Sequence, residues 1–291
     1  KAFIKAIDKY GVGAGSSPII SGYSVPHQKL EEDLSHYLGF DSVLVTNSGY
    51  LSNVGVVNAI SKRDTVVFQD RENHNSIIES SRLSSTKLVR YKHLSTVDLK
   101  NKLTEYSNSK NKIIFTDSVF SMTGEISPLE EILKLKKLNK ANIFVDDAHG
   151  FCVMNCLKET QYLPSICSYL NLNKKSIDAY IGTFGKAVGT FGSFVAGKKS
   201  FIELLVQKSK PYIYSTALPP SIAEATRSSL KIIKKNKIIF EKLYNNINYF
   251  IKNTDHINKK LNHSVTPIQS FMIGNPKDTI KIKKKAFKDG I

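Results

Sequence analysis

The sequence lacks long apolar runs and is poor in cysteine. No segment approaches the roughly 18 consecutive apolar residues of a transmembrane helix, so we expect neither a membrane span nor a membrane partner. Lys1–Tyr10 has helical spacing and lacks the ordered regions of a signal peptide. An odd number of cysteines (Cys152, Cys156 and Cys167) without a paired framework predicts a reducing, cytoplasmic location. No histidine or cysteine pair accompanies them at metal-binding spacing, so no metal site is expected.

Arginine is also scarce, although the chain is strongly basic. Lysine and arginine together number 42 against 25 acidic residues, which gives a net charge of +17. Surfaces that bind nucleic acid favour arginine, because its planar guanidinium makes paired contacts with phosphates and bases. Arginine occurs only at Arg63, Arg71, Arg82, Arg90 and Arg227. The composition therefore favours a solvated lysine-rich surface over a nucleic-acid partner, with attraction of a polyanionic acyl-CoA as a lesser alternative.

Short apolar runs alternate along the 291 residues with segments of helical spacing. Several runs are continuous, as in strands that are buried on both faces. The expected strands are Val43–Thr46, Thr65–Gln69, Leu88–Tyr91, Lys112–Thr116, Asn142–Val145, Ala179–Gly182 and Ser193–Ala196. This alternation predicts an α/β fold with a mostly parallel seven-stranded sheet and helices on both faces. Such sheets bind ligands beyond the carboxyl ends of their strands.

Two of the expected helices have clear ends. Gln28–Leu38 places leucines four residues apart and stops at Gly39, a residue type that commonly ends helices. Pro128–Leu138 begins with a proline, which suits a first helical turn.

The character of the chain changes after about Pro219. Ser221–Tyr249 is a long lysine-rich helical stretch, and His263–Ile273 has the pattern of the opening of a smaller domain. We therefore expect a large domain over residues 1–230, with an N-terminal segment missing. Residues 231–291 are expected to form the start of a smaller C-terminal α+β domain.

A strand that runs directly into charged residues gives the first candidate site. Asn142–Gly150 reads N-I-F-V-D-D-A-H-G, with Asp146 where the buried strand emerges. A carboxylate there can pair with a protonated ring nitrogen and keep it protonated. The alternative is an aspartate that caps the next helix. Taken alone, the motif favours that alternative.

A lysine among glycines gives the second candidate site. Gly182–Phe191 reads G-T-F-G-K-A-V-G-T-F, so Lys186 follows an apolar strand directly. Glycines let the backbone approach a ligand, and a desolvated lysine can attack a carbonyl as a neutral amine. Because Ala187 follows the lysine, the segment does not match the nucleotide-binding phosphate loop. A glycine-rich turn with an incidental lysine explains this segment equally well when it is taken alone.

Four other segments give weaker signals. Ser48–Asn53 (S-G-Y-L-S-N) follows a strand and offers a helix N-terminus to a phosphate. His74 could stack on a flat heterocycle, although a lone loop histidine is more often simply solvated. Ser121, in D-S-V-F-S-M-T-G, could donate a hydrogen bond. The segment Y-I-Y-S-T-A-L-P-P carries the hydroxyls of Ser215 and Thr216 before a double proline.

Together, these segments form a recognisable order: a glycine turn, a histidine, a serine, D-x-A-H and T-x-x-K, each after a strand. This order resembles the fold-type-I enzymes that use pyridoxal phosphate (PLP). More narrowly, it resembles the α-oxoamine synthase family over nearly the whole chain. Within that family, Ser21–Glu31 (S-G-Y-S-V-P-H-Q-K-L-E) and Y-I-Y-S-T-A-L-P-P are most similar to the 8-amino-7-oxononanoate synthases of biotin biosynthesis.

The resemblance implies a role for each matching residue around the cofactor ring. Lys186 would hold PLP as a Schiff base and remove the α-proton of the amino acid. Asp146 would pair with the pyridine nitrogen. His149 and Ser121 would bond the phenolic oxygen of the ring. His74 would stack on the ring and help to orient the substrate.

Further residues would hold the cofactor phosphate. The resemblance assigns Gly49, Tyr50 and Thr183 to this role within one subunit. Ser215 and Thr216 would reach the phosphate of a neighbouring subunit, which would make the site a property of a homodimer. The alternative is that these two hydroxyls only cap the following helix.

The implied reaction is an acyl transfer. L-Alanine would condense with a pimeloyl thioester of CoA or of an acyl-carrier protein, with decarboxylation, to give 8-amino-7-oxononanoate. An alternative within the family is glycine C-acetyltransferase or another α-oxoamine synthase. An alternative of another class is an inactive PLP-fold subunit that only binds a partner, and Lys186 and Asp146 count against it. A third alternative, a nucleic-acid-binding protein, rests on charge alone.

The sequence also departs from the family pattern. Asp117 stands where the family commonly has glutamate, so we expect its contact near the cofactor to be shorter or lost. After His149 the family has a G-x-G turn, whereas Phe151 follows Gly150 here and the stretch up to Ile177 is lengthened. The segment that supplies a substrate-binding arginine and the end of the small domain are expected to lie outside this chain. This expectation leaves the activity of the chain by itself in doubt.

Overall fold

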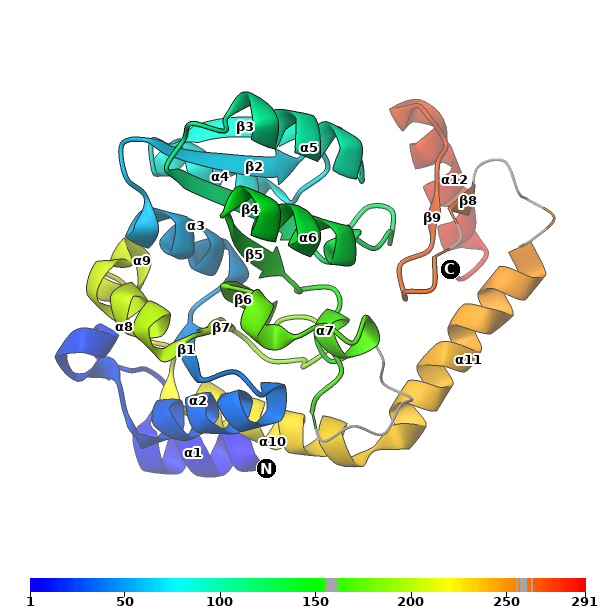
Figure 1. Cartoon of the computed structure of the whole chain (residues 1–291). Helices are drawn as coiled ribbons and strands as arrows, with labels where there is room; N and C mark the ends of the chain where they lie inside the picture. Colours follow the sequence, from blue (N-terminus) through cyan, green and yellow to red (C-terminus); the bar gives the residue numbers. More distant parts are fainter. Residues whose placement is uncertain (155–161, 255, 257–260, 263) are drawn as a thin grey trace.

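A seven-stranded sheet lies at the centre of the molecule, between two layers of helices (Figure 1). The structure is a computed structural model that describes residues 1–154, 162–254, 256, 261–262 and 264–291. The strands of the large sheet are β1 (Ser42–Thr46), β2 (Thr65–Asp70), β3 (Lys87–Tyr91), β4 (Asn111–Asp117), β5 (Asn142–Asp146), β6 (Ala179–Thr183) and β7 (Ser193–Gly197). Each contains the apolar run expected to form it, so the expected α/β fold is confirmed.

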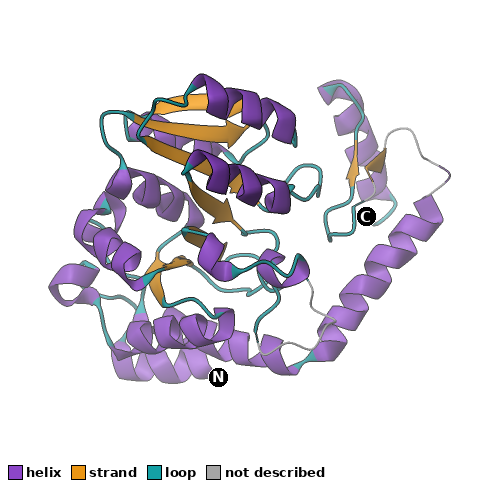
Figure 2. Ribbon diagram, viewed as in Figure 1, coloured by secondary structure: helices purple, strands orange, loops and turns teal. Residues whose placement is uncertain are grey.

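Helices occupy most of the chain between and after these strands (Figure 2). The α-helices are α1 (Ala2–Tyr10), α2 (Val25–Leu38), α3 (Gly49–Ile60), α4 (Asn75–Leu83), α5 (Thr96–Glu105), α6 (Leu129–Asn139), α7 (Ile166–Tyr169), α8 (Lys199–Lys208), α9 (Lys210–Ile213), α10 (Pro220–Lys235), α11 (Lys237–Thr254) and α12 (Pro276–Lys288). A π-helix, η1 (Pro18–Gly22), and a 3-10 helix, η2 (Lys174–Ser176), are shorter. Strands β8 (Leu261–Asn262) and β9 (Ser270–Phe271) pair in a second, small sheet.

The strand order β1-β7-β6-β5-β4-β2-β3 brings the candidate residues to one edge of the sheet. The pairs β3·β2, β2·β4, β4·β5 and β5·β6 are parallel, whereas β7 runs antiparallel to both β1 and β6. In the register of β4 and β5, Asp117 stands opposite Asp146. Because parallel strands end at the same edge, the residues after β4, β5 and β6 meet there.

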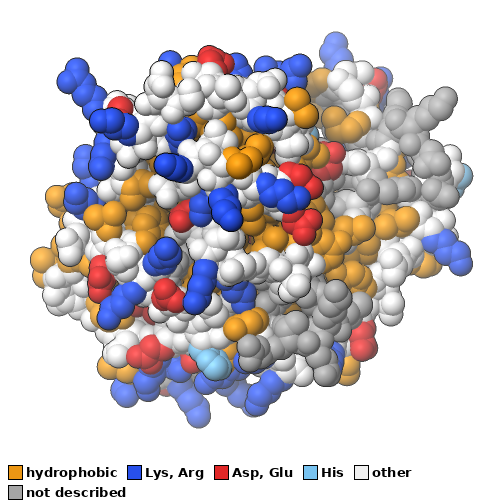
Figure 3. Space-filling model, in the orientation of Figure 1, with side chains coloured by type: hydrophobic (Ala, Val, Ile, Leu, Met, Phe, Trp, Pro, Cys, Tyr) orange, Lys and Arg blue, Asp and Glu red, His pale blue; other side chains and the backbone are white. Residues whose placement is uncertain are grey.

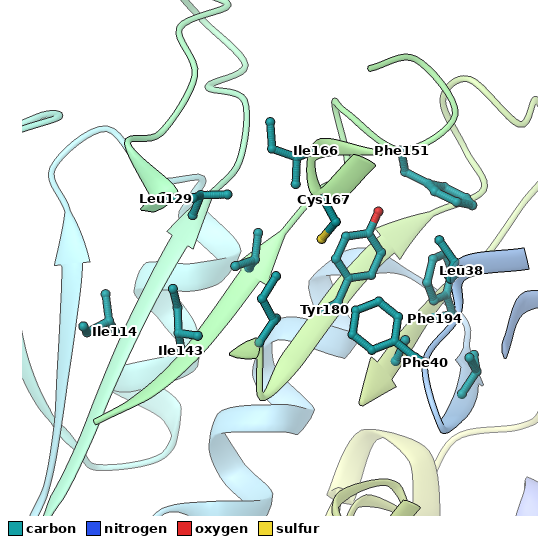
Figure 4. Packing of buried hydrophobic residues seen from close by; sticks show 14 of the residues in the cluster. Leu38, Phe40, Ile114, Leu129, Ile143, Phe151, Ile166, Cys167, Tyr180 and Phe194 are labelled. Atoms are coloured by element: carbon teal, nitrogen blue, oxygen red, sulfur yellow. The ribbon is translucent and has the colours of Figure 1, made fainter. Parts of the chain in front are cut away.

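The sheet is buried on both faces, which explains why its strands read as continuous apolar runs. One face packs against leucines of α2, α5 and α6 and includes Ile143 and Tyr180. The other packs against α3, α4 and α8 and includes Phe144 and Ile181. Figure 4 shows Tyr180 in the first cluster with Phe40, Phe194 and Leu38.

Several helix boundaries differ from the expected ones: α2 begins at Val25 rather than Gln28, and α6 ends at Asn139 rather than Leu138. Pro128 is the N-cap of α6 rather than its first helical residue. The stretch expected as one helix, Ser221–Tyr249, is broken at Asn236, whose φ of −110° and ψ of 88° lie outside the helical region. The sequence pattern missed this break because helical spacing continues on both sides of it. Gly39 ends α2 as expected, with a left-handed φ of 71°.

Charged residues are spread over the visible surface. On the face shown in Figure 3, lysine and arginine side chains are scattered, with acidic residues between them. No helix in the described part of the chain has the length and apolar character needed to cross a bilayer.

His93 links two segments near the carboxyl edge of the sheet. Its Nδ1 lies 2.8 Å from Asp70 Oδ1 at the end of β2, and its Nε2 lies 3.1 Å from Glu125 Oε2. Beside Glu125, the carbonyl of Gly124 accepts a hydrogen bond from Ser264 Oγ at 2.6 Å. His93 therefore links the turn that carries Gly124 and Glu125 to the sheet. The C-terminal segment contacts the same turn through Ser264.

This linkage predicts a pH-dependent contribution to stability. Burial lowers the pKa of His93, but hydrogen bonds and charges of Asp70 and Glu125 outweigh burial and raise it above its usual value. A raised pKa means that the contribution is complete below about pH 6.5 and is lost as the pH rises through the folded-state value. Between about pH 6 and pH 9, the free energy of unfolding in urea should fall by about 1 kcal/mol more in the parent than in His93→Gln. If the free energy of unfolding changes with pH by the same amount in the parent and in His93→Gln, the linkage is contradicted.

Candidate active site

A cavity opens beyond the carboxyl ends of β4, β5 and β6. It has about 540 Å³ of empty space, part of it open to solvent. This is within the usual size range for small-molecule sites. Its lining consists of Gly49, Tyr50, His74, Ser76, Asp117, Asp146, Ala148, His149, Thr183 and Lys186.

Most of the candidate residues come together in this cavity, and three do not line it. Ser121 lies in the turn between Val119 and Ile126, which pair in a short bridge. Ser215 and Thr216 line a second cavity, together with residues of α2 and the end of β1. The second cavity contains about 440 Å³ of empty space.

Asp146 is held in place at the end of β5. Its side chain is 5% exposed; Oδ1 accepts the Ala148 N–H at 2.9 Å and Oδ2 accepts Asn53 Nδ2 at 2.7 Å. Turn residues rather than a helix follow it, so the helix-capping alternative does not apply. The two bonds fix the carboxylate while it faces the cavity.

Lys186 and His149 meet across the cavity. Lys186 Nζ lies 2.7 Å from His149 Nε2. Burial lowers the pKa of Lys186, although the charges of Asp146 and Asp117 oppose this shift. Burial and the charges of Lys186 and His74 lower the pKa of His149 to about 4. A neutral His149 can therefore accept a hydrogen bond from the lysine nitrogen.

The N-terminus of α3 faces the same cavity and suits a phosphate. Ser48 caps this helix, and its side chain accepts the N–H of Leu51 at 3.3 Å. The N–H groups of Gly49 and Tyr50 have no protein acceptor in the described part of the chain. A Cβ at Gly49 would meet nothing within 4 Å, so there is room for an anion beside the backbone.

Asp117 keeps a contact in the cavity although it is shorter than glutamate. Its Oδ2 accepts the backbone N–H of His74 at 2.6 Å, and its own N–H donates to Asn73 Oδ1 at 3.1 Å. Burial and the neighbouring charge of Asp146 raise its pKa well above the usual value. Asp117 thus holds the turn that presents His74 to the cavity.

Asp147 points to the other side of β5 and anchors the turn that carries Asp146 and His149. It is fully buried; Oδ1 accepts Ser118 Oγ, and Oδ2 accepts Tyr180 Oη at 2.6 Å and the Ile166 N–H at 3.0 Å. The turn lies close against it, since a Cβ at Gly150 would stand 2.1 Å from Oδ1. Figure 4 shows the hydroxyl of Tyr180 on the side of Cys167 and Phe151.

Replacing Asp147 with alanine should destabilise the protein by about 3 kcal/mol, because it leaves several buried donors without an acceptor. Asparagine keeps one oxygen for Tyr180 and Ile166, so Asp147→Asn should cost only about 1 kcal/mol. Urea unfolding of the parent and both variants measures the difference. If Asp147→Ala costs no more than Asp147→Asn, the anchoring interpretation is wrong.

Sequence reasoning missed two residues of the site, Asn53 and Ser76. Asn53 lies inside α3 and bonds Asp146, and Ser76 lies in the first turn of α4 at the cavity wall. Asn53 ends the S-G-Y-L-S-N segment but was given no role in it, and the contacts of both residues are what reveal them. Cys156 and the part of the lengthened stretch at residues 155–161 lie outside the described residues.

The donor set of the cavity fits PLP. A phosphate suits the open N-terminus of α3, a protonated ring nitrogen suits the Asp146 carboxylate, and an aldehyde suits Lys186. In the described part of the chain, no three side chains of histidine, cysteine, aspartate or glutamate cluster as metal ligands do.

Comparisons with known proteins agree with this fit. The model of the family "Aminotransferase class I and II" matches residues 1–289. An 8-amino-7-oxononanoate synthase from Methylococcus capsulatus is 36% identical over 285 residues, which are 98% of this chain and 72% of the relative.

Two solved structures share the fold. The 8-amino-7-oxononanoate synthase of Francisella tularensis has a TM-score of 0.83 and 27% identity, over 99% of this chain and 80% of that one. A serine palmitoyltransferase of S. paucimobilis, solved with a bound PLP–myriocin aldimine, has a TM-score of 0.88 and 25% identity, over 95% of this chain and 70% of that one. The chain therefore has the fold of PLP-dependent enzymes of type I and belongs to the class I and II aminotransferase family, as a relative of the 8-amino-7-oxononanoate synthases.

Proposed function

We propose that this protein joins L-alanine to a pimeloyl thioester with loss of CO₂, the reaction that forms 8-amino-7-oxononanoate in biotin biosynthesis. The observation that carries the proposal is the meeting of Lys186 and Asp146 in one cavity, beside an open helix N-terminus. The names of the matched relatives support the choice of substrates.

Each residue has a defined task in this reaction. When bound, PLP withdraws electrons from the amino acid and so makes loss of its α-proton possible. Lys186 Nζ binds the cofactor and accepts that proton, which its lowered pKa favours. His149 orients the lysine nitrogen through the 2.7 Å contact. Asp146 keeps the ring nitrogen protonated.

Steady-state assays with alanine, glycine and serine against pimeloyl and acetyl thioesters test the proposal. The proposed function predicts the highest kcat/KM for alanine with the pimeloyl thioester. A preference for glycine with acetyl-CoA would instead assign glycine C-acetyltransferase. PLP binding without turnover of any pair would favour a binding subunit. Assays with CoA and acyl-carrier-protein thioesters would identify the carrier.

We further propose a homodimer in which Ser215 and Thr216 complete the partner's phosphate site. The capping alternative has no support among the described residues, since Pro219 is the N-cap of α10 and no side-chain hydrogen bond to it is seen there. Thr216 does not line the cavity that contains Lys186 in its own subunit. Its backbone carbonyl accepts a hydrogen bond from Asn47 Nδ2 at 2.7 Å, which fixes its position. The half-buried Ser215 and exposed Thr216 are thus placed to contact another chain.

Mixed dimers test the shared site. One subunit carries Lys186→Ala, and the other carries Ser215→Ala with Thr216→Ala. If each variant alone is strongly impaired, a mixed dimer should regain about half of the parent activity, because one of its two sites has neither lesion. If subunits exchange and no activity returns, the sharing proposal is wrong.

We also propose the division into residues 1–230 and a partial small domain at 231–291. Helix α10 packs on α1 and α2, whereas α11 leads toward the small sheet of β8 and β9 (Figure 1). A cytoplasmic location remains a proposal that rests on the unpaired cysteines, of which Cys152 and Cys167 are buried free thiols.

A further inference from the structure

His74 is the N-cap of α4, and this position favours one of the two tautomers of its ring. The backbone N–H of Ser76 points at His74 Nδ1 from 3.3 Å. A backbone N–H can only donate, so this long contact favours a lone pair on Nδ1. A neutral His74 therefore carries its proton on Nε2.

The hydroxyl of Ser76 reinforces this arrangement. Ser76 Oγ lies 2.7 Å from His74 Nδ1 and 2.8 Å from Asn53 Nδ2. Since the amide nitrogen donates to the hydroxyl oxygen, the hydroxyl proton is free to point at Nδ1. Two donors from Ser76 thus converge on one ring nitrogen.

Asn53 connects this arrangement to Asp146. Its Nδ2 also lies 2.7 Å from Asp146 Oδ2. The nitrogen of the amide, and not its oxygen, must face a carboxylate, because a carboxylate only accepts. Both protons of the amide are then used, one toward Asp146 and the other toward Ser76.

Burial makes the chain of bonds effective. Asn53 is 0% exposed, Ser76 is 1% exposed and Asp146 is 5% exposed. Water does not compete for such groups, and hydrogen bonds in a poorly solvated interior strengthen one another. The hydrogen bonds therefore run outward from Asn53, to Asp146 on one side and through the Ser76 hydroxyl to His74 on the other.

We propose that Ser76 and Asn53 are positioning residues that hold His74 as the neutral tautomer with its proton on Nε2 and couple its orientation to that of Asp146. The inference rests on the proposed function for its consequence in catalysis. His74 then offers the cavity a hydrogen-bond donor, which suits a carboxylate or carbonyl oxygen of the amino-acid or acyl substrate.

Nitrogen-15 NMR of histidine-labelled protein tests the tautomer without substrate or turnover. The chain has seven histidines, so a His74→Gln sample assigns the signals of His74. The parent should show a protonated Nε2 and an unprotonated Nδ1. Ser76→Ala removes the nearer donor and should give a mixture of the two tautomers, and Ser76→Thr should restore the parent state. The matched control is Ser80→Ala, which removes a buried hydroxyl of the same helix that bonds only the Ile77 carbonyl.

Kinetics supply a second readout. Ser76→Ala should lower kcat about fivefold, the usual effect of one hydrogen bond, with unchanged PLP stoichiometry. A parent with a proton on Nδ1, or a tautomer that is the same in Ser76→Ala, would overturn the inference. Inactivity of the parent with alanine and pimeloyl thioester, together with the expected NMR signals, would reject the proposed function and leave the tautomer assignment intact.

Discussion

Lys186→Ala should lower kcat by roughly 10⁴-fold, the upper end of what a positioned proton acceptor contributes. The variant loses both the nitrogen that binds the cofactor covalently and the group that accepts the substrate proton. Borohydride reduction followed by peptide mapping should label Lys186 in the parent and leave the variant unlabelled. The fold should persist, because the lysine side chain contacts the cavity and not the core.

Lys199→Ala is the matched control for this prediction. Lys199 begins α8 and is exposed, so its loss should change neither the label nor kcat. A label on another lysine of PLP-saturated parent, or a Lys186→Ala variant with near-parent kcat, would refute the assignment of Lys186.

Asp146→Asn should lower kcat by roughly 10²–10³-fold. An opposite charge at close range shifts a pKa by about 1–3 units, so removing it lets the ring nitrogen lose its proton. The new amide nitrogen must also face either Asn53 Nδ2 or the Ala148 N–H. Both of these groups are donors that need an acceptor. Measurements are kcat and the visible absorbance of bound PLP, which should both change.

Asp41→Asn, at an exposed aspartate just before β1, controls for the general effect of removing one negative charge. It should leave kcat and the absorbance unchanged. Near-parent kcat and absorbance in Asp146→Asn would show that the carboxylate does not face the ring nitrogen.

The strands were predictable from the sequence because burial on both faces forces continuous apolar runs, as in Phe144 and Val145 of β5. The break at Asn236 was not predictable, because helical spacing continues on both sides of it, although α10 packs on α1 and α2. Local periodicity contains no information about such packing.

The residues of the candidate site likewise fall into those that the sequence predicted and those that it did not. Asp146, His149 and Lys186 stand in short motifs directly after strands, so their convergence follows from the fold. Asn53 and Ser76 are ordinary polar residues of two helices, and their value comes from a contact between positions 23 residues apart. No pattern along the chain marks such a contact before the helices are placed.

The edge strand β1 joins the sheet by pairing with a strand far along the chain: Ser42 of β1 lies opposite Gly197 of β7. The cavity residues between Gly49 and Lys186 all lie inside the loop that this pairing closes. Pairings between distant segments are the slow steps of folding, because the entropy of loop closure precedes the contacts that repay it. In a refolding experiment, the return of PLP absorbance should therefore follow the slowest folding phase and be insensitive to PLP concentration once PLP is in excess.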